Sequence, residues 1–130
     1  MSQAARVEAL RNELRDSRGA LRDAYLKGRT PNWLLHAHSR LIDRTLQDIW
    51  RSHAPAKRMA LVATGGYGRG ELFPSSDVDV LVLLGAEPTS AERERIEQLI
   101  GMFWDVGLEI GHSVRTVDAC IESEIGRAHV

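Results

Sequence analysis

The sequence predicts an α/β (α+β) fold in which two helices precede a small mixed sheet. Apolar residues recur at helical spacing over residues 3–50. After them, short apolar runs alternate with another helical stretch, and glycines or prolines separate the segments. With 130 residues, of which 43% are hydrophobic and 27% charged, the chain can form one domain with a buried core.

The N-terminal part is expected to form two amphipathic helices. The first covers residues 3–27 and ends near Gly28. The second starts with Thr30 as N-cap and Pro31 in its first turn, and it should stop before Pro55. The apolar faces are Val7, Leu10, Leu14, Leu21 and Tyr25 in the first helix, and Leu34, Leu35, Leu41, Ile42, Leu46, Ile49 and Trp50 in the second.

Three apolar runs predict the strands of the sheet. The first strand covers about residues 59–64. Residues 78–84 are nearly all apolar, which is typical of a central strand that is covered on both faces. The third strand is expected over residues 108–114, after a break at Val106 and Gly107.

Two further helices are expected on either side of the third strand. Thr89 or Ser90 can cap the first of them, and Thr116 begins the second. The side chains expected to face inward from the first of these helices are Ile96, Leu99, Ile100, Phe103 and Trp104.

Three parts are expected along the chain. Residues 1–56 form an N-terminal helical segment, and residues 57–123 form the part that contains the sheet. The last seven residues, 124–130, match the translation of a common sequencing adapter. We therefore expect residues 124–130 to be a non-native tail and the natural protein to continue past residue 123.

The composition argues against several functions. A formal net charge of −1 gives no global basic field, so nucleic acid is not an expected partner. The single cysteine, Cys120, excludes an internal disulfide and a cysteine-rich zinc module. No apolar run approaches the roughly 20 residues of a membrane span, and the N-terminus has no apolar signal region. We expect a cytoplasmic protein without a membrane partner.

A glycine-rich turn and a pair of aspartates form the most informative motif. Backbone N–H groups of the turn at residues 65–70 can bind phosphate oxygens. Asp77 and Asp79 are two residues apart at the start of a strand, so they point to the same face, about 6–7 Å apart at the backbone. A divalent cation, Mg²⁺ or Mn²⁺, would relieve their repulsion. The alternative is an ordinary polar turn in which Ser75, Ser76 and Asp77 cap the strand entry.

The better-known phosphate motifs do not fit these residues. A Walker A loop that starts at Gly65 requires a lysine where this chain has Glu71. A dinucleotide-binding fingerprint on Gly66 and Gly68 requires a glycine at the same position. Another arrangement must therefore bind the phosphates.

The spacing of Gly65-Gly66 and Asp77-Val78-Asp79 resembles the nucleotidyltransferase superfamily that includes DNA polymerase β. More narrowly, residues 65–72, 76–79 and 104–115 are similar to the bifunctional PII uridylyltransferase/uridylyl-removing enzymes. This resemblance implies a polymerase β-like fold, of which residues 57–123 are a partial nucleotidyltransferase domain. It implies transfer of UMP from UTP to a tyrosine of the protein PII, with release of pyrophosphate. Glutamine is implied as an effector of the full-length parent only.

The resemblance also implies roles for individual residues. Asp77 and Asp79 would bind the metal, and Gly65 and Gly66 would contact the triphosphate. A third carboxylate is expected on a neighbouring strand. Glu109 fits this expectation as a metal ligand or as the acceptor of the attacking hydroxyl's proton, with an ion pair to Arg115 as the alternative.

Other polar residues permit both a functional and a structural interpretation. Arg69 and Ser76 could contact phosphate, but Arg69 could equally pair with Glu71, and Ser76 could simply form a turn. The four histidines that lack ligand-type neighbours are expected to be structural: His36, His38, His53 and His112.

Two other functions stay open from the sequence alone. The chain could belong to another polymerase β-like nucleotidyltransferase that uses ATP and a different acceptor, because no residue of the motif selects the base. It could also be a non-catalytic nucleotide-sensing module. We expect the isolated chain to be weakly active or inactive.

Overall fold

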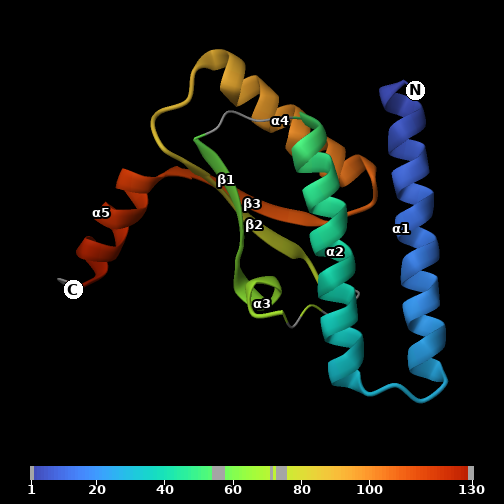
Figure 1. Cartoon of the computed structure of the whole chain (residues 1–130). Helices are drawn as coiled ribbons and strands as arrows, with labels where there is room; N and C mark the ends of the chain where they lie inside the picture. The colour runs from blue at the N-terminus through green and yellow to red at the C-terminus, as the bar shows by residue number, and fades with distance from the viewer. Residues whose placement is uncertain (1, 54–57, 71, 73–75, 129–130) are drawn as a thin grey trace.

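The computed structural model describes residues 2–53, 58–70, 72 and 76–128, with side chains as far as residue 122 (Figure 1). It confirms an α+β fold in which helices accompany a small mixed sheet. The elements are α1 (Gln3–Leu26), α2 (Pro31–His53), β1 (Met59–Ala63), α3 (Gly65–Gly68), β2 (Val78–Leu84), α4 (Ser90–Asp105), β3 (Ile110–Thr116) and α5 (Val117–Ala128).

The described strands form one sheet in the order β1-β2-β3. β1 and β2 are antiparallel, with Ala63 opposite Val80. β2 and β3 are parallel, with Val78 beside Ile110. This arrangement makes β2 the central strand and brings the starts of β2 and β3 to the same end of the sheet.

The two N-terminal helices are largely as the sequence predicts. They lie side by side in Figure 1, and Thr30 caps α2 by accepting a hydrogen bond from Trp33 N–H (3.1 Å). Tyr25 is an exception, because it is 38% exposed at the end of α1. The core residues from these helices are Leu14, Leu41, Ile42, Leu46 and Ile49, with Val7, Leu10, Leu21 and Trp50 packed against them.

α4 starts with a complete capping box. Thr89 Oγ1 accepts from Glu92 N–H (3.1 Å), and the Glu92 carboxylate accepts from Thr89 N–H (2.9 Å). Ile96, Leu99, Ile100 and Phe103 are buried, as expected.

The expectation that Trp104 faces inward is wrong. Trp104 is 52% exposed, whereas Met102 is 2% exposed. Successive residues are rotated by about 100° around a helix, and the buried face of α4 is centred on Leu99 and Phe103. Met102 therefore lies on the buried side of α4, and Trp104 lies on the side that faces solvent.

The expectation that β2 is covered on both faces is also wrong for this chain. Its alternate side chains Val78, Val80, Val82 and Leu84 are buried in one cluster with residues of α2 and α4. On the other face Asp79 is exposed, and Leu81 and Leu83 are only partly buried. The helices therefore cover one face of the sheet.

The elements around the sheet differ from the prediction in their bounds. The glycine turn contains a one-turn helix, α3, and β1 ends one residue earlier than expected. β3 starts at Ile110 instead of 108 and continues to Thr116, because its pairing with β2 sets its limits. Thr116 then caps α5 by accepting from Ala119 N–H (3.0 Å). No described helix is long and apolar enough to cross a membrane.

Candidate active site

The glycine turn and the aspartate pair meet at Asp79. The antiparallel ladder continues past Ala63 by one bond, in which Thr64 N–H donates to the Asp79 carbonyl (3.0 Å). This bond sets the following residue, Gly65, against the carboxylate: a β-carbon at Gly65 would lie 3.0 Å from Asp79 Oδ2. Gly65 also has a φ of +59°, which favours glycine. A motif that spans 15 residues of sequence thus becomes one site.

The other side of Asp79 is occupied by Gly111 on β3. The two residues are direct neighbours in the parallel register. A β-carbon at position 111 would lie 2.6 Å from Asp79 Oδ1, so a larger side chain would displace the carboxylate. Local spacing along the sequence does not point to Gly111. Its one sequence signal is a glycine inside a strand, which often marks close approach.

Asp77 and Glu109 lie one residue before the paired Val78 and Ile110, and Val78 N–H donates to the Glu109 carbonyl (2.8 Å). Both side chains are exposed at this end of the sheet. Among the described residues, however, no three His, Cys, Asp or Glu side chains are grouped so that they could hold a metal ion. Glu109 as a third carboxylate therefore stays a prediction.

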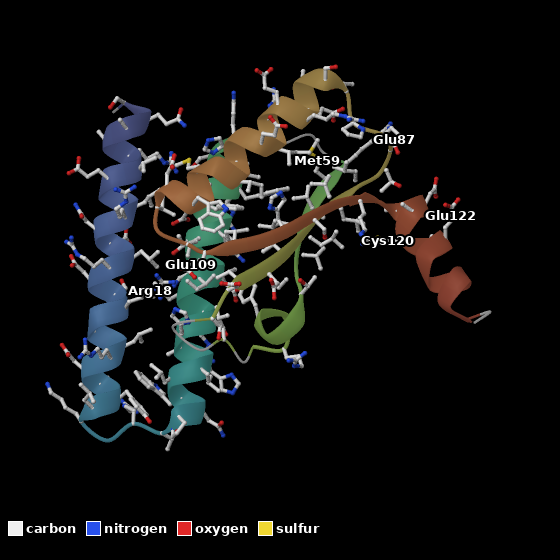
Figure 2. All side chains as sticks on the ribbon, turned by 180° about the vertical axis from the view of Figure 1, so that it is seen from behind. Arg18, Met59, Glu87, Glu109, Cys120 and Glu122 are labelled. Atoms are coloured by element: carbon white, nitrogen blue, oxygen red, sulfur yellow. The ribbon has the colours of Figure 1, made fainter. Side chains whose placement is uncertain are left out.

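The arginine near Glu109 is Arg18, and not Arg115, which the sequence suggested as a partner. Figure 2 shows Glu109 and Arg18 close together, where α1 passes the end of the sheet. Burial lowers the pKa of the Arg18 guanidinium, and the Glu109 carboxylate partly offsets this effect. The described part of the chain has no ion pair between Glu109 and Arg115.

Residues of α2 bind the glycine turn at Tyr67 and also bind Leu72. Tyr67 of α3 is buried and donates its hydroxyl to the Asp43 carboxylate. Burial and this carboxylate raise the pKa of Tyr67, so the hydroxyl keeps its proton. Further along, both backbone groups of Leu72 are bound: His38 Nδ1 contacts its carbonyl (3.2 Å), and Ser39 Oγ accepts from its N–H (3.4 Å).

The remaining predicted site residues lie around this turn. Gly66 is inside α3, and Arg69 is exposed directly after it. Ser76 is exposed just before Asp77. Glu71, the predicted partner of Arg69, lies outside the described residues.

Two of the four histidines, His38 and His53, make backbone contacts that fit the predicted structural role. His53 Nδ1 contacts the Ile49 carbonyl within α2 (3.0 Å). His112 lines a hollow of about 590 Å³ between α4 and β3, away from the aspartates. His38 is 1% exposed and holds Leu72, and His36 lies near Gly70.

Two exposed carboxylates next to a glycine turn can bind a hard cation that arrives with a phosphate ligand. Mg²⁺ is commonly bound through one or two carboxylates, with water and substrate phosphates completing its shell. The donor set of Asp77 and Asp79 fits this mode of binding better than a closed protein cage.

The sequence matches the family described as "Nucleotidyltransferase domain" over residues 43–124. This match includes β1, the glycine turn, the aspartate pair and β3. The chain belongs to the nucleotidyltransferase domain family.

More specific similarity is to curated proteins named "Bifunctional uridylyltransferase/uridylyl-removing enzyme". The protein of Chromobacterium violaceum is 46% identical over 124 residues, which are 95% of this chain and 14% of that protein. The protein of Thiobacillus denitrificans is 51% identical over 112 residues, or 86% of this chain and 13% of that protein. The protein of Burkholderia mallei strain SAVP1 is 58% identical over 89 residues, which are 68% of this chain and 10% of that protein. The chain thus spans a small part of these relatives. No solved structure matches it.

Proposed function

We propose that this chain is part of a metal-dependent uridylyltransferase that transfers UMP from UTP to a tyrosine hydroxyl of the protein PII. The names of the relatives support uridylyl transfer. The acceptor PII, the cation and the cytoplasmic location come from the resemblance of the motifs. The observation that carries the proposal is the position of the Asp79 carboxylate between Gly65 and Gly111, beside the glycine turn.

The proposed reaction is an in-line displacement at the α-phosphorus of UTP. The tyrosine oxygen forms a new P–O bond, the bond to the bridging oxygen breaks, and pyrophosphate leaves. Gly65 and Gly66 leave room for the triphosphate to approach the backbone. Glu109 is the proposed acceptor of the hydroxyl proton, because it is exposed next to Asp77.

Asp77 and Asp79 are the proposed ligands of the cation. When bound, Mg²⁺ or Mn²⁺ would neutralise the developing charge on the phosphates and the leaving group. Gly111 contributes by leaving the space in which the Asp79 carboxylate lies. Arg69 and Ser76 are proposed to contact phosphate oxygens at the rim of the turn.

A chimeric enzyme tests this proposal. Residues 1–123 of this chain replace the matching part of the Chromobacterium violaceum relative, and transfer of labelled UMP to PII is measured with Mg²⁺. We expect transfer by the chimera and a loss of at least about 100-fold in Asp77→Asn and Asp79→Asn. Transfer that persists in both variants would refute the role of the carboxylates.

A further inference from the structure

We propose that Arg18 of α1 is a positioning residue: it holds His38 in the one tautomer that can bind the Leu72 carbonyl, and so fixes the position of Leu72. The link from Leu72 to nucleotide binding rests on the proposed function, whereas the hydrogen bonds that hold Leu72 can be tested without it.

Arg18 is distinguished from its helix neighbours by its contacts. It is partly buried, whereas Arg15 and Arg22 are exposed. Its Nε donates to His38 Nε2 (3.3 Å), and its Nη1 donates to the Gly107 carbonyl (3.4 Å). One guanidinium therefore connects α1 to α2 and to the loop that leads into β3.

The two contacts of His38 determine its tautomer. A guanidinium N–H can only donate, so Nε2 of His38 must accept. A carbonyl can only accept, so Nδ1 must carry the proton and donate to Leu72. Burial also keeps the imidazole neutral by lowering its pKa. The hydrogen bond from Arg18 therefore selects the form of His38 that holds Leu72.

Leu72 is the residue that this chain of hydrogen bonds holds in place. It is 1% exposed, and α2 binds both its carbonyl and its N–H, through His38 and Ser39. It lies between Gly70, where the glycine turn ends, and Asp77. Under the proposed function, we therefore expect the position of Leu72 to affect nucleotide binding.

The same guanidinium lies close to Glu109 at the end of the sheet (Figure 2). Two effects of Arg18 must therefore be separated: donation to His38 and attraction of Glu109. Arg18→Gln places an amide nitrogen where Nε stands and removes the charge. Arg18→Met has a similar length but no donor. The proposal predicts that Gln preserves the position of Leu72 and that Met does not.

The test uses the 130-residue chain labelled with ¹⁵N. We expect the ¹⁵N spectrum of His38 to show the Nδ1–H tautomer in the wild type and R18Q, and a shift toward Nε2–H in R18M. Hydrogen exchange of the Leu72 N–H should be at least about 10-fold faster in R18M. Arg15→Met is the matched control, because Arg15 is exposed and pairs with the adjacent Asp16. Arg18→Lys, which keeps the charge but moves the donor, should shift the tautomer in the same direction if R18M does not fold.

Binding of UTP with Mg²⁺, measured by calorimetry, provides the functional readout. We expect an approximately 10-fold higher Kd for R18M and a change below about 3-fold for R18Q and R15M, since each factor of ten corresponds to about 1.4 kcal/mol. An unchanged tautomer and unchanged Leu72 exchange in R18M would overturn the proposal. If the wild type does not bind UTP, the proposed function fails, and the tautomer and exchange measurements still decide the role of Arg18.

Discussion

At the scale of single residues, the candidate site depends on space as much as on charge. Asp79 fits because the residues on both sides of its carboxylate, Gly65 and Gly111, have no side chain. The aspartates provide the carboxylate groups, and the glycines leave the space in which the Asp79 carboxylate lies. Substitution of a glycine therefore tests the site without removing any functional group.

Gly111→Ala should weaken UTP binding with Mg²⁺ by at least about 10-fold, or 1.4 kcal/mol. The new methyl group would stand 2.6 Å from Asp79 Oδ1, so the carboxylate must rotate away. Because Asp79 is exposed, the free energy of unfolding should change by about 1 kcal/mol or less. Calorimetry and urea unfolding measure the two quantities.

Gly101→Ala is the control for this prediction. It lies within α4, and a β-carbon there would have no atom within 4 Å. It should leave UTP binding unchanged and stabilise the chain by about 0.5–1 kcal/mol. Equal binding by the wild type and Gly111→Ala would contradict the account of Asp79.

His38 should make stability depend on pH. Burial lowers its pKa, the hydrogen bond to Leu72 partly offsets this, and Arg18 lowers it further. In the unfolded chain, His38 has a pKa of about 6.5. At a pH between this value and the lower folded-state pKa, the unfolded chain therefore binds more protons than the folded chain. The stabilising contribution is therefore present above about pH 6.5 and is lost as the pH falls through the folded-state pKa.

Urea unfolding between pH 7.5 and pH 5 measures this loss. His38→Asn keeps a donor in the place of Nδ1 but does not titrate, so its stability should fall less over the same range. A pH dependence identical to that of the wild type would show that His38 is not the responsible group.

The sequence predicted the residues whose partners are close along the chain. Gly65, Asp77 and Asp79 stand in one short motif, and the structure brings Gly65 against Asp79. That both aspartates point to one face stays a prediction from their spacing. Gly111, Arg18 and His38 could not be found in this way. Their roles come from the register of β3 and from the packing of α1 on α2, which local spacing does not specify.

At the scale of elements, α3 is too short to be stable by itself, and α2 holds it through the Tyr67–Asp43 hydrogen bond. Tyr67→Phe should therefore cost about 0.5–1.5 kcal/mol of unfolding free energy. Asp43→Asn keeps an acceptor oxygen and should cost less than Asp43→Ala. Urea unfolding of the three variants measures these differences, and an unchanged stability in Tyr67→Phe would contradict this anchoring.

The capping box of α4 should contribute to stability and not to the site. Thr89→Ala removes the hydroxyl that accepts from Glu92 N–H and should destabilise the chain by about 1 kcal/mol. UTP binding should stay unchanged, because α4 contributes no residue to the aspartate site. A large loss of binding at unchanged stability would show that α4 does more than support the sheet.

Helix and strand positions were largely predictable because caps and apolar periodicity are local signals. Thr30 and Thr89 cap helices as expected. Thr116, which was expected to begin a helix, ends β3 and caps α5. The orientation of Trp104 was not predictable, because tertiary packing decides which part of a wide apolar face is buried. The start of β3 was missed for a similar reason, since pairing with β2 defines it.

At the scale of the whole molecule, helices cover one face of the sheet, and the exposed Asp79 lies on the other. The fold therefore separates a supporting side from a side that can receive a nucleotide. The sequence predicted the order of elements but not this asymmetry, because the apolar run of β2 suggested burial on both faces.

The central claim is that Asp77 and Asp79 form a cation-dependent UTP site beside the glycine turn. Calorimetric titration of the chain with UTP tests it most directly, in Mg²⁺ and in EDTA, for the wild type, Asp77→Asn and Asp79→Asn. We predict binding by the wild type in Mg²⁺ that is lost in EDTA and in both variants, while thermal unfolding without nucleotide stays unchanged in EDTA. UTP binding that is equally strong in EDTA, or in both variants, would contradict the claim.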